Sequence, residues 1–453
     1  MKLYGKPFTL LLILALSLTL TACGAGGKGD SAEEITTLIY ANLTEGGVDR
    51  QAVEKFNRTH TDVQIEVRDY FDEEGSDGKE RLFTEIAAGK MPDIIDMGNS
   101  LTHSHRLPYQ MMVHKGLLEN LWPYIENDPD LGRESVVEAP LKAAEVNGGL
   151  YVAFNCVSVL SLAGAESMVG NRYSWTLEEL QEAFSAMPEG STVLEYFLSK
   201  EGMFYSLLGM SINSYVDWKT GECSFTGERF KSVLEFLNHL PDESEVGVIN
   251  DYVDVNEEAT DRLMHGYQML GTIIISWPSE IQFFDAYYGL GGRAAFVGFP
   301  MENGEVGSSF EIKGPRLAMS SVCKNKDAAW DFIRQIFLPQ YKTVEIMEKK
   351  QKFGFPINRA DYDLMKKLDM DIGRNETRAL MDGPMVEFRK ATAEEFQRYE
   401  DFINHIRKID LFDNEILNIA QELAGAYFVG DKTLDETVAL IQNRVQLYVN
   451  ENR

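Results

Sequence analysis

Two short apolar segments of this chain are each followed by an asparagine. Asn42 follows residues 34–41, and Asn99 lies just beyond residues 93–97. Both segments have the length and composition of strands. In open α/β sheets, small ligands bind in the loops beyond the carboxyl ends of the strands. An asparagine amide can donate and accept hydrogen bonds at once, so Asn42 and Asn99 are candidates to bind a small polar ligand.

An aromatic side chain ends a third apolar segment. Trp277 comes two residues after the isoleucines 273–275, whose β-branched side chains favour a strand. One face of a sugar ring presents C–H groups, and an indole ring can cover that face while the hydroxyls stay free to bond. Trp277 is therefore a candidate to stack on a ligand with such a face, and Asn42 and Asn99 are candidates to bond to the polar groups of that ligand. From position alone, a place in the core fits Trp277 equally well.

The sequence lacks the spacings of common catalytic and metal sites. It has no G-x-S-x-G, H-E-x-x-H or phosphate-loop pattern. His103 and His105 could approach Asp96, but their spacing matches no zinc motif. Residues 289–294 fit G-x-G-x-x-A, yet a strand-like segment follows them where a dinucleotide site needs a long helix. We therefore expect no catalytic residue, no metal ion and no cofactor.

Strand-like and helix-like segments alternate in the first hundred residues. Strands are expected at 34–41, 63–67 and 93–97, with helices at 48–57 and 82–87 between them. The helices carry apolar residues at helical spacing, and the middle strand alternates apolar with polar residues. The order β-α-β-α-β is typical of a mostly parallel sheet with helices on its faces.

The composition is strongly acidic. The chain has 453 residues, with 43 Lys and Arg against 71 Asp and Glu, for a formal net charge of −28. Nucleic-acid binding needs basic stripes, so this balance argues against it and also disfavours polyanionic ligands. An apolar content of 44% is enough for large cores, and the length suits two or three domains.

The amino-terminal segment has the pattern of a secreted lipoprotein. Lys2 and Lys6 precede the apolar run 8–20, which is short for a membrane span and typical of a secretion signal. The run ends in Leu-Thr-Ala-Cys, which resembles a bacterial lipobox and predicts lipidation of Cys23. We therefore expect a signal peptide at 1–22 and a flexible, glycine-rich tether at 23–34. The other cysteines are read as buried small residues, because their odd number and wide spacing do not predict a disulfide framework; they are Cys156, Cys223 and Cys323.

Several passages resemble, in the same order, the family 1 extracellular solute-binding proteins, the sugar-capturing receptors of ABC importers. The most informative is AAGKMPDII at 87–95, where Gly89 and Pro92 end a helix before a strand. The other passages are 116–125, 147–154, 271–278, 324–333 and 353–358.

This resemblance implies an α/β, two-lobed periplasmic-binding-protein fold of the clamp-like type II, with the ligand between the lobes. On this interpretation lobe 1 comprises 35–152 and 301–340, and lobe 2 comprises 153–300 and 341–453. The lobes should hinge near Ala153 and Pro300.

The resemblance also implies ligand-binding residues. It favours the site over the core for Trp277. It places Phe154 and Asn155 at a crossing between the lobes. It puts Phe355 either at the cleft or in the packing beside it. Trp218, which lies among charged residues, is expected on a surface turn.

The function implied is carbohydrate capture, with an oligosaccharide as the expected ligand. The partners would be the permease subunits of an ABC importer, and the lipid anchor would hold a monomeric protein at the outer face of a bacterial membrane. Three alternatives stay open. The fold could bind a peptide, polyamine or metal ion; the protein could be a surface glycosidase that uses two of its many carboxylates; or it could be a ligand-sensing partner of a membrane kinase.

Overall fold

The computed structural model describes residues 35–43, 50–70, 78–98, 109–194, 199–209, 211–240, 260–301, 304–339, 354–373, 376–380, 383–411 and 413–452. Cys23, the signal peptide, the tether and Asn99 lie outside these ranges. Within them, no helix has the length and apolar character needed to cross a membrane. The same ranges hold no cluster of three or more His, Cys, Asp or Glu side chains that could bind a metal ion.

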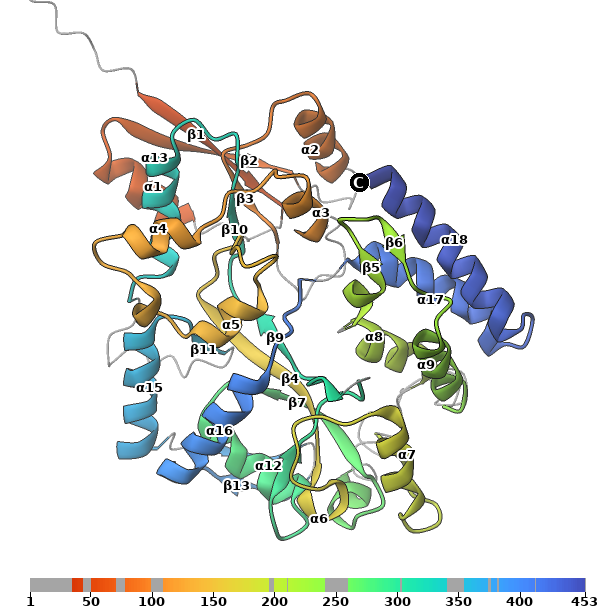
Figure 1. Ribbon diagram of the computed structural model, residues 1–453. Helices are drawn as coiled ribbons and strands as arrows, with labels where there is room; N and C mark the ends of the chain where they lie inside the picture. The colour runs from red at the N-terminus through yellow and green to blue at the C-terminus, as the bar shows by residue number, and fades with distance from the viewer. Residues whose placement is uncertain are drawn as a thin grey trace, which may run out of the picture.

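The first lobe is built on a four-stranded sheet with the order β10-β3-β1-β2 (Figure 1). β1 pairs in parallel with β2 and β3, and β10 is antiparallel to β3. The β-α-β-α-β expectation is confirmed. The elements are β1 (Thr36–Asn42), α1 (Arg50–Thr59), β2 (Val63–Asp69), α2 (Gly78–Ala87), β3 (Ile94–Asp96) and β10 (Leu317–Met319).

Short helices complete this lobe, and aromatic side chains fill its core. The ring of Phe332 meets the rings of Tyr40 and Phe56 edge-on, with centroids 6.0 and 5.5 Å away. Trp330, expected to be structural, is buried and donates its indole N–H to Asp128 at 2.8 Å. The helices are α3 (Tyr109–His114), α4 (Trp122–Asn127), η1 (Arg133–Ser135), α5 (Glu138–Ala143), α13 (Lys326–Ile333) and η5 (Arg334–Ile336).

The second lobe is organised around one long strand, β4 (Cys156–Ala165). It lies at the centre of a five-stranded sheet, and every partner strand is antiparallel to it. Since both faces of β4 are covered, nine of its ten residues are buried. The partner strands are β7 (Leu270–Ile275), β8 (Ala294–Phe296), β9 (Ser309–Ile312) and β11 (Phe355–Pro356).

Helices and the small β12–β13 pair flank this sheet. The helix expected after Trp175 is present and begins with the expected capping box, in which Thr176 and Glu179 bond reciprocally. The elements are α6 (Glu166–Val169), α7 (Leu177–Ser185), η3 (Pro278–Glu280), α12 (Ile281–Tyr288), α15 (Arg359–Asp371), β12 (Thr377–Arg378), β13 (Val386–Glu387) and α16 (Ala393–His405).

A helical group packs beside the second lobe and reaches toward the first (Figure 1). Its last helix starts at the expected Thr433 and Glu436 cap. The group consists of α8 (Lys200–Gly209), η2 (Ile212–Tyr215), β5 (Val216–Asp217), β6 (Glu222–Cys223), α9 (Glu228–Asn238), α17 (Asn414–Phe428) and α18 (Leu434–Asn452).

Two sequence expectations differ from the structure. β9 was expected in lobe 1, but it pairs with β4, so the chain crosses between the sheets at 313–316 rather than at Pro300. Trp218 is only 4% exposed, because its ring packs against Tyr448 of α18, with centroids 6.4 Å apart. The charged neighbours of Trp218 in the sequence point to solvent, while its own ring does not.

Candidate functional site

The two sheets are joined by crossing segments at 150–156 and 313–316. The two segments are bonded to each other, because the backbone N–H of Lys313 donates to the carbonyl of Cys156 at 3.0 Å, and Ala153 and Leu317, at the start of β10, exchange backbone hydrogen bonds of 2.7 and 2.9 Å. A third segment, 406–411, links α16 to α17 and bonds through Lys408 and Asp410 to the backbone of Phe310. We call these three segments, together with the adjoining strand β9, the floor of the interlobe region. Backbone bonding between them holds the floor side chains in fixed positions.

The floor carries an ion pair on one face. Along β9 the side chains alternate: Phe310 and Ile312 point into the core, whereas Glu311 points to the other face. The Glu311 carboxylate forms a salt bridge with Lys313 at 3.0 Å and accepts a hydrogen bond from the Ser158 hydroxyl at 3.1 Å. The Lys313 and Glu311 side chains are 9% and 16% exposed. They are thus largely shielded from solvent but still reachable, which is the condition for a charged group to bind a ligand strongly.

An aromatic residue of the helical group faces the same place. The side chain of Tyr205, on α8, is half-buried. Burial raises the pKa of its phenol, and the negative charges of Asp410 and Glu311 raise it further. The phenol therefore stays protonated and can donate a hydrogen bond.

A second ion pair lies deeper in the floor. Arg316 contacts the Asp410 carboxylate at 2.6 Å, and these side chains are 7% and 5% exposed. Asp410 also accepts the backbone N–H of Ile312 at 3.0 Å, and the backbone carbonyl of Arg316 accepts that of Met97 at 2.7 Å. This pair therefore connects crossing segment 313–316, segment 406–411 and the end of β3.

Polar side chains stand at the ends of the parallel strands in lobe 1. Asn42 is buried and donates to the Asp69 carboxylate at 2.8 Å, and Arg50 contacts the same carboxylate at 3.1 Å. Asp96 accepts from the Tyr40 hydroxyl at 3.1 Å and from the Gly98 backbone. Burial raises the pKa of Asp96, and these hydrogen bonds oppose the rise. The segments that follow β1, β2 and β3 lie outside the described residues.

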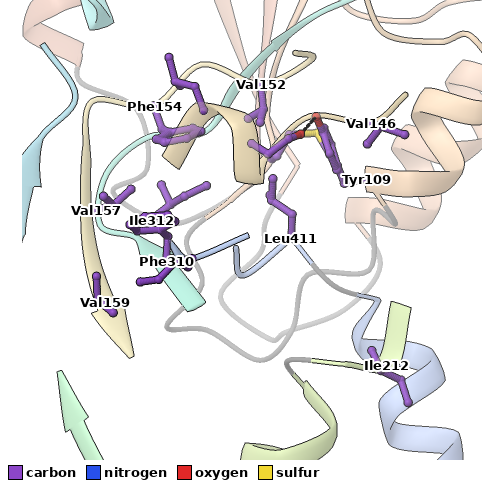
Figure 2. Packing of buried hydrophobic residues seen from close by; sticks show 14 of the residues in the cluster. Tyr109, Val146, Val152, Phe154, Val157, Val159, Ile212, Phe310, Ile312 and Leu411 are labelled. Atoms are coloured by element: carbon purple, nitrogen blue, oxygen red, sulfur yellow. Dashed lines mark hydrogen bonds between the residues drawn. The ribbon is translucent and has the colours of Figure 1, made fainter. Parts of the chain in front are cut away.

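Two of the expected aromatic site residues lie in the core. Phe355 is fully buried and meets Phe310, Tyr362 and Tyr399 edge-on at 5.9 to 6.3 Å between centroids. Phe154 is fully buried as well, and Figure 2 shows its ring near Val157 and Ile312. Neither ring offers surface to a ligand in this conformation. Of the two positions expected for Phe355, the structure shows the one in the packing and not the one at the cleft.

Asn155 and Trp277 lie at the end of the lobe 2 sheet that is nearest to the floor. The backbone carbonyl of Asn155 accepts the N–H of Ile357 at 2.8 Å. Trp277 follows β7 where Ile275 pairs with Val159, and its backbone N–H donates to Glu280 at 3.1 Å. Trp277 is buried, with 6% of its surface exposed. Its role in stacking stays a prediction.

Sequence reasoning missed the charged floor. Glu311 and Lys313 are two residues apart in a strand-like segment, and that spacing places both on one face. The alternation of Ser309 to Lys313 was thus a usable signal for the pair. Their contact with Ser158, and the approach of Tyr205 and Asp410, depend on strand pairing between distant parts of the chain.

Two cavities lie between elements that are far apart in the sequence, and no floor residue is among their lining residues. The front cavity, of about 680 Å³, lies between lobe 1 and the β5–β6 hairpin, and Gln110, His114, Asn147, Asp217 and Trp218 are among its lining residues. The rear cavity, of about 660 Å³, lies between η1 and α5 on one side and α15 and α16 on the other. In Figure 1 the rear elements lie on the left and the β5–β6 hairpin lies on the right. Both volumes lie in the range of small-molecule sites.

No protein-family model and no curated protein matches the sequence. Solved structures do match it. The sugar-binding protein MalE from the phytopathogen Xanthomonas citri is 16% identical, with a TM-score of 0.52 over 92% of this chain and 98% of that chain. This chain has the two-lobed fold of the MalE-like solute-binding proteins. The expected fold class is therefore confirmed.

Two further solved structures are similar over the same share of the chain. A de novo designed esterase is 14% identical, with a TM-score of 0.51 over 92% of this chain and 99% of that chain. A family 1 extracellular solute-binding protein from Alicyclobacillus acidocaldarius is 15% identical, with a TM-score of 0.49 over 92% of this chain and its own full length.

Proposed function

We propose that this protein is an extracytoplasmic receptor that captures a carbohydrate between its lobes and delivers it to the permease of an ABC importer. The observation that carries the proposal is the charged floor in a MalE-like fold. Glu311 and Ser158 lie on paired strands of the lobe 2 sheet, next to the crossing segment that contains Lys313, and the other face of β9 is apolar. The similarity to a sugar-binding protein of the same fold supports carbohydrate as the ligand.

The chemistry of the floor suits hydroxyl groups. A sugar hydroxyl both donates and accepts, so it can insert beside an ion pair, donating to Glu311 and accepting from Lys313. Such charge-assisted hydrogen bonds are about twice as strong as neutral ones. Tyr205 adds a phenolic donor, and Trp277 at the end of β7 is the proposed stacking surface.

The glycosidase alternative finds less support at the floor. General acid catalysis needs a carboxyl group with a raised pKa beside a second carboxylate. Here Glu311 contacts Lys313 and Asp410 contacts Arg316, so each carboxylate already has a cationic partner. This arrangement favours binding without hydrolysis.

Delivery to a permease requires that the lobes close on the ligand and that the protein stay at the membrane. We propose that closure bends the crossing segments 150–156 and 313–316, and that lipid on Cys23 anchors the chain. Cys23→Ser should release the protein or leave it unprocessed. Labelled palmitate in that variant would contradict the anchor.

A titration of residues 24–453 tests the binding function. We expect at least one of maltose, maltotetraose, cellobiose, cellotetraose, xylobiose and xylotetraose to bind with a micromolar or lower Kd in calorimetry. Glu311→Gln should weaken that ligand about tenfold or more, since a bond to a charged group contributes roughly 1.5–3 kcal/mol. Glu394→Gln, on an exposed ion pair with Arg293, is the matched control and should leave the Kd unchanged.

Three outcomes would contradict this function. Absence of binding across the panel would argue against a carbohydrate ligand. Chromatography of the same mixtures that showed shortened products would favour the glycosidase. Small-angle scattering with an unchanged radius of gyration at saturating ligand would contradict closure.

A further inference from the structure

The β5–β6 hairpin is attached to lobe 2. On α18, Gln442 and Gln446 donate to the backbone carbonyls of Cys223 and Gly221 at 2.9 and 2.6 Å, which holds the hairpin on the helical group. That group packs against lobe 2, where residues of α8 and α9 line a small cavity of about 40 Å³ together with Leu177 of α7. The hairpin therefore follows lobe 2 when the lobes move relative to each other.

The opposite wall of the front cavity belongs to lobe 1. It is formed by α3, whose Tyr109 hydroxyl donates to the carbonyl of Ala144 at 2.9 Å, and by the turn that follows α5. His114, the last residue of α3, is exposed and lines the cavity, whereas Lys115, which follows it, is exposed outside the lining. The helix α3 and the hairpin are neighbours in Figure 1. Rotation of the lobes about the crossing segments therefore changes the distance between His114 and the hairpin.

Asp217 gives the hairpin wall a negative charge opposite His114. It is exposed, and its carboxylate accepts the backbone N–H groups of Thr220 and Lys219 at 3.2 and 2.8 Å. These hydrogen bonds lower the pKa of Asp217, and the charge of His114 lowers it further, so Asp217 stays ionised. The ion pairs of the described residues do not join His114 to Asp217. The two groups therefore attract each other across the cavity without direct contact.

The other charged residues of the lining show how the two walls respond to pH. Glu145 stands on the lobe 1 wall, and Lys219 and Glu222 stand beside Asp217 on the hairpin. With His114 neutral, both walls carry a net negative charge and repel each other. Protonation of His114 brings the lobe 1 wall to neutrality and places a cation opposite Asp217. Since histidine changes its charge near neutral pH, repulsion between the walls gives way to attraction in that range.

We propose that His114 and Asp217 form a pH-sensitive latch, in which the protonated imidazole attracts the carboxylate across the front cavity and favours the closed arrangement of the lobes. This inference rests on the proposed function and adds regulation by pH to it. The closed state then holds the proton of His114 more tightly than the open state does, so a fall in pH favours closure. Ligand and proton both favour the closed state, and ligand affinity should therefore rise as the pH falls.

The test compares ligand affinity at pH 5.5 and pH 8.0 in variants of the two latch residues. Calorimetry uses residues 24–453 and the glycan of the panel that binds most tightly. We expect the wild type to bind about threefold more tightly at pH 5.5, which is the size of effect expected of a solvent-exposed charge pair. His114→Gln and Asp217→Asn should each remove this difference. His114→Lys, which keeps a cation at both pH values, should bind tightly at both.

His265→Gln is the matched control. His265 is an exposed histidine that also has an aspartate beside it, Asp261 at 3.1 Å, but it does not line the front cavity. Its replacement should leave the pH dependence of binding unchanged. Asp413, which also titrates in this range, is the same in every variant, so its contribution cancels. Equal affinities of the wild type at the two pH values, or an equal pH dependence in the wild type and His114→Gln, would overturn the latch.

Small-angle scattering without ligand keeps this inference separate from the proposed function. The radius of gyration of the wild type should be smaller at pH 5.5 than at pH 8.0, and His114→Gln should show no such change. The same contraction in both proteins would overturn the latch even where a sugar binds. Absence of binding by all six glycans would overturn the proposed function, and the scattering comparison would then decide on the latch alone.

Discussion

The front and rear cavities have nearly the same volume but differ in the charged side chains of their walls. At the rear, Arg133 contacts Glu126 at 2.6 Å and stacks on Trp122, and Arg359 donates to the carbonyl of Val136. The lobes also touch there through the backbone, since Val137 donates to Ile357 at 2.8 Å. Each cavity has a lining residue with a buried polar atom that lacks a partner among the described residues: the Tyr362 hydroxyl at the rear and the Trp218 N–H at the front.

This difference teaches that cavity size does not identify a ligand site. The rear cations already have partners, so a ligand there would have to replace existing bonds. At the front, the walls are formed by lobe 1 and by the β5–β6 hairpin. Four predictions test this contrast.

The largest effect is expected in the floor. Asp410→Asn leaves Arg316 buried without its full counter-charge, and removal of one partner of a buried pair costs roughly 3–5 kcal/mol. Urea unfolding should show this loss. Glu394→Gln should cost at most about 1 kcal/mol, since its pair with Arg293 is exposed. Similar costs for the two variants would mean that the floor pair does not hold the segments together.

A pH-dependent effect is expected where the front wall meets α17. Burial raises the pKa of Asp413 from its usual value of 3.8 to about 6, although Glu415, Ile416 and Tyr448 donate hydrogen bonds to the carboxylate. The folded state thus holds this proton more tightly than the unfolded chain. The stabilisation is complete below pH 4 and is lost as the pH rises through 6, for a total of about 3 kcal/mol.

Asp413→Asn tests this directly, because asparagine keeps the helix cap and does not titrate. Between pH 4 and pH 7, the unfolding free energy of the wild type should fall relative to that of the variant. Parallel pH profiles for the two proteins would show that Asp413 does not titrate in this range.

A third variant tests whether the binding surface includes Trp277, at the end of β7. If Trp277 stacks on a sugar, Trp277→Ala should weaken ligand binding by about 2 kcal/mol or more, which is roughly thirtyfold. Calorimetry and thermal melting of this variant measure affinity and stability separately. An unchanged Kd together with a large fall in melting temperature would assign Trp277 to the core.

The smallest effect is expected when one side-chain amide is removed from the lining of each cavity. Asn147→Ala at the front should cost about 1 kcal/mol of tetrasaccharide affinity, the contribution of one hydrogen bond. Gln397→Ala at the rear should change that affinity by less than about 0.5 kcal/mol, as is usual for a surface substitution away from a site. Equal losses from the two variants would remove the distinction between the cavities.

The sequence alone was sufficient for the local structure. The β-α-β-α-β start, the caps at Thr176 and Thr433, and the strand before Trp277 follow from periodicity and capping chemistry, which involve residues close in the chain. The order of resembling passages was sufficient for the two-lobed fold, which the solved structures confirm.

Only the tertiary structure decided which side chains are available to a ligand. Phe154 and Phe355 have site-like positions in the sequence, yet strand pairing around β4 turns both into the core. In the sequence, Glu311 and Lys313 are two charged residues among many. They become part of one charged region only when β9 pairs with β4 and Asp410 lies against Arg316. The physical reason is that the periodicity of a helix or strand determines only which of its side chains share a face. Which face becomes buried depends on partners that are a hundred or more residues away.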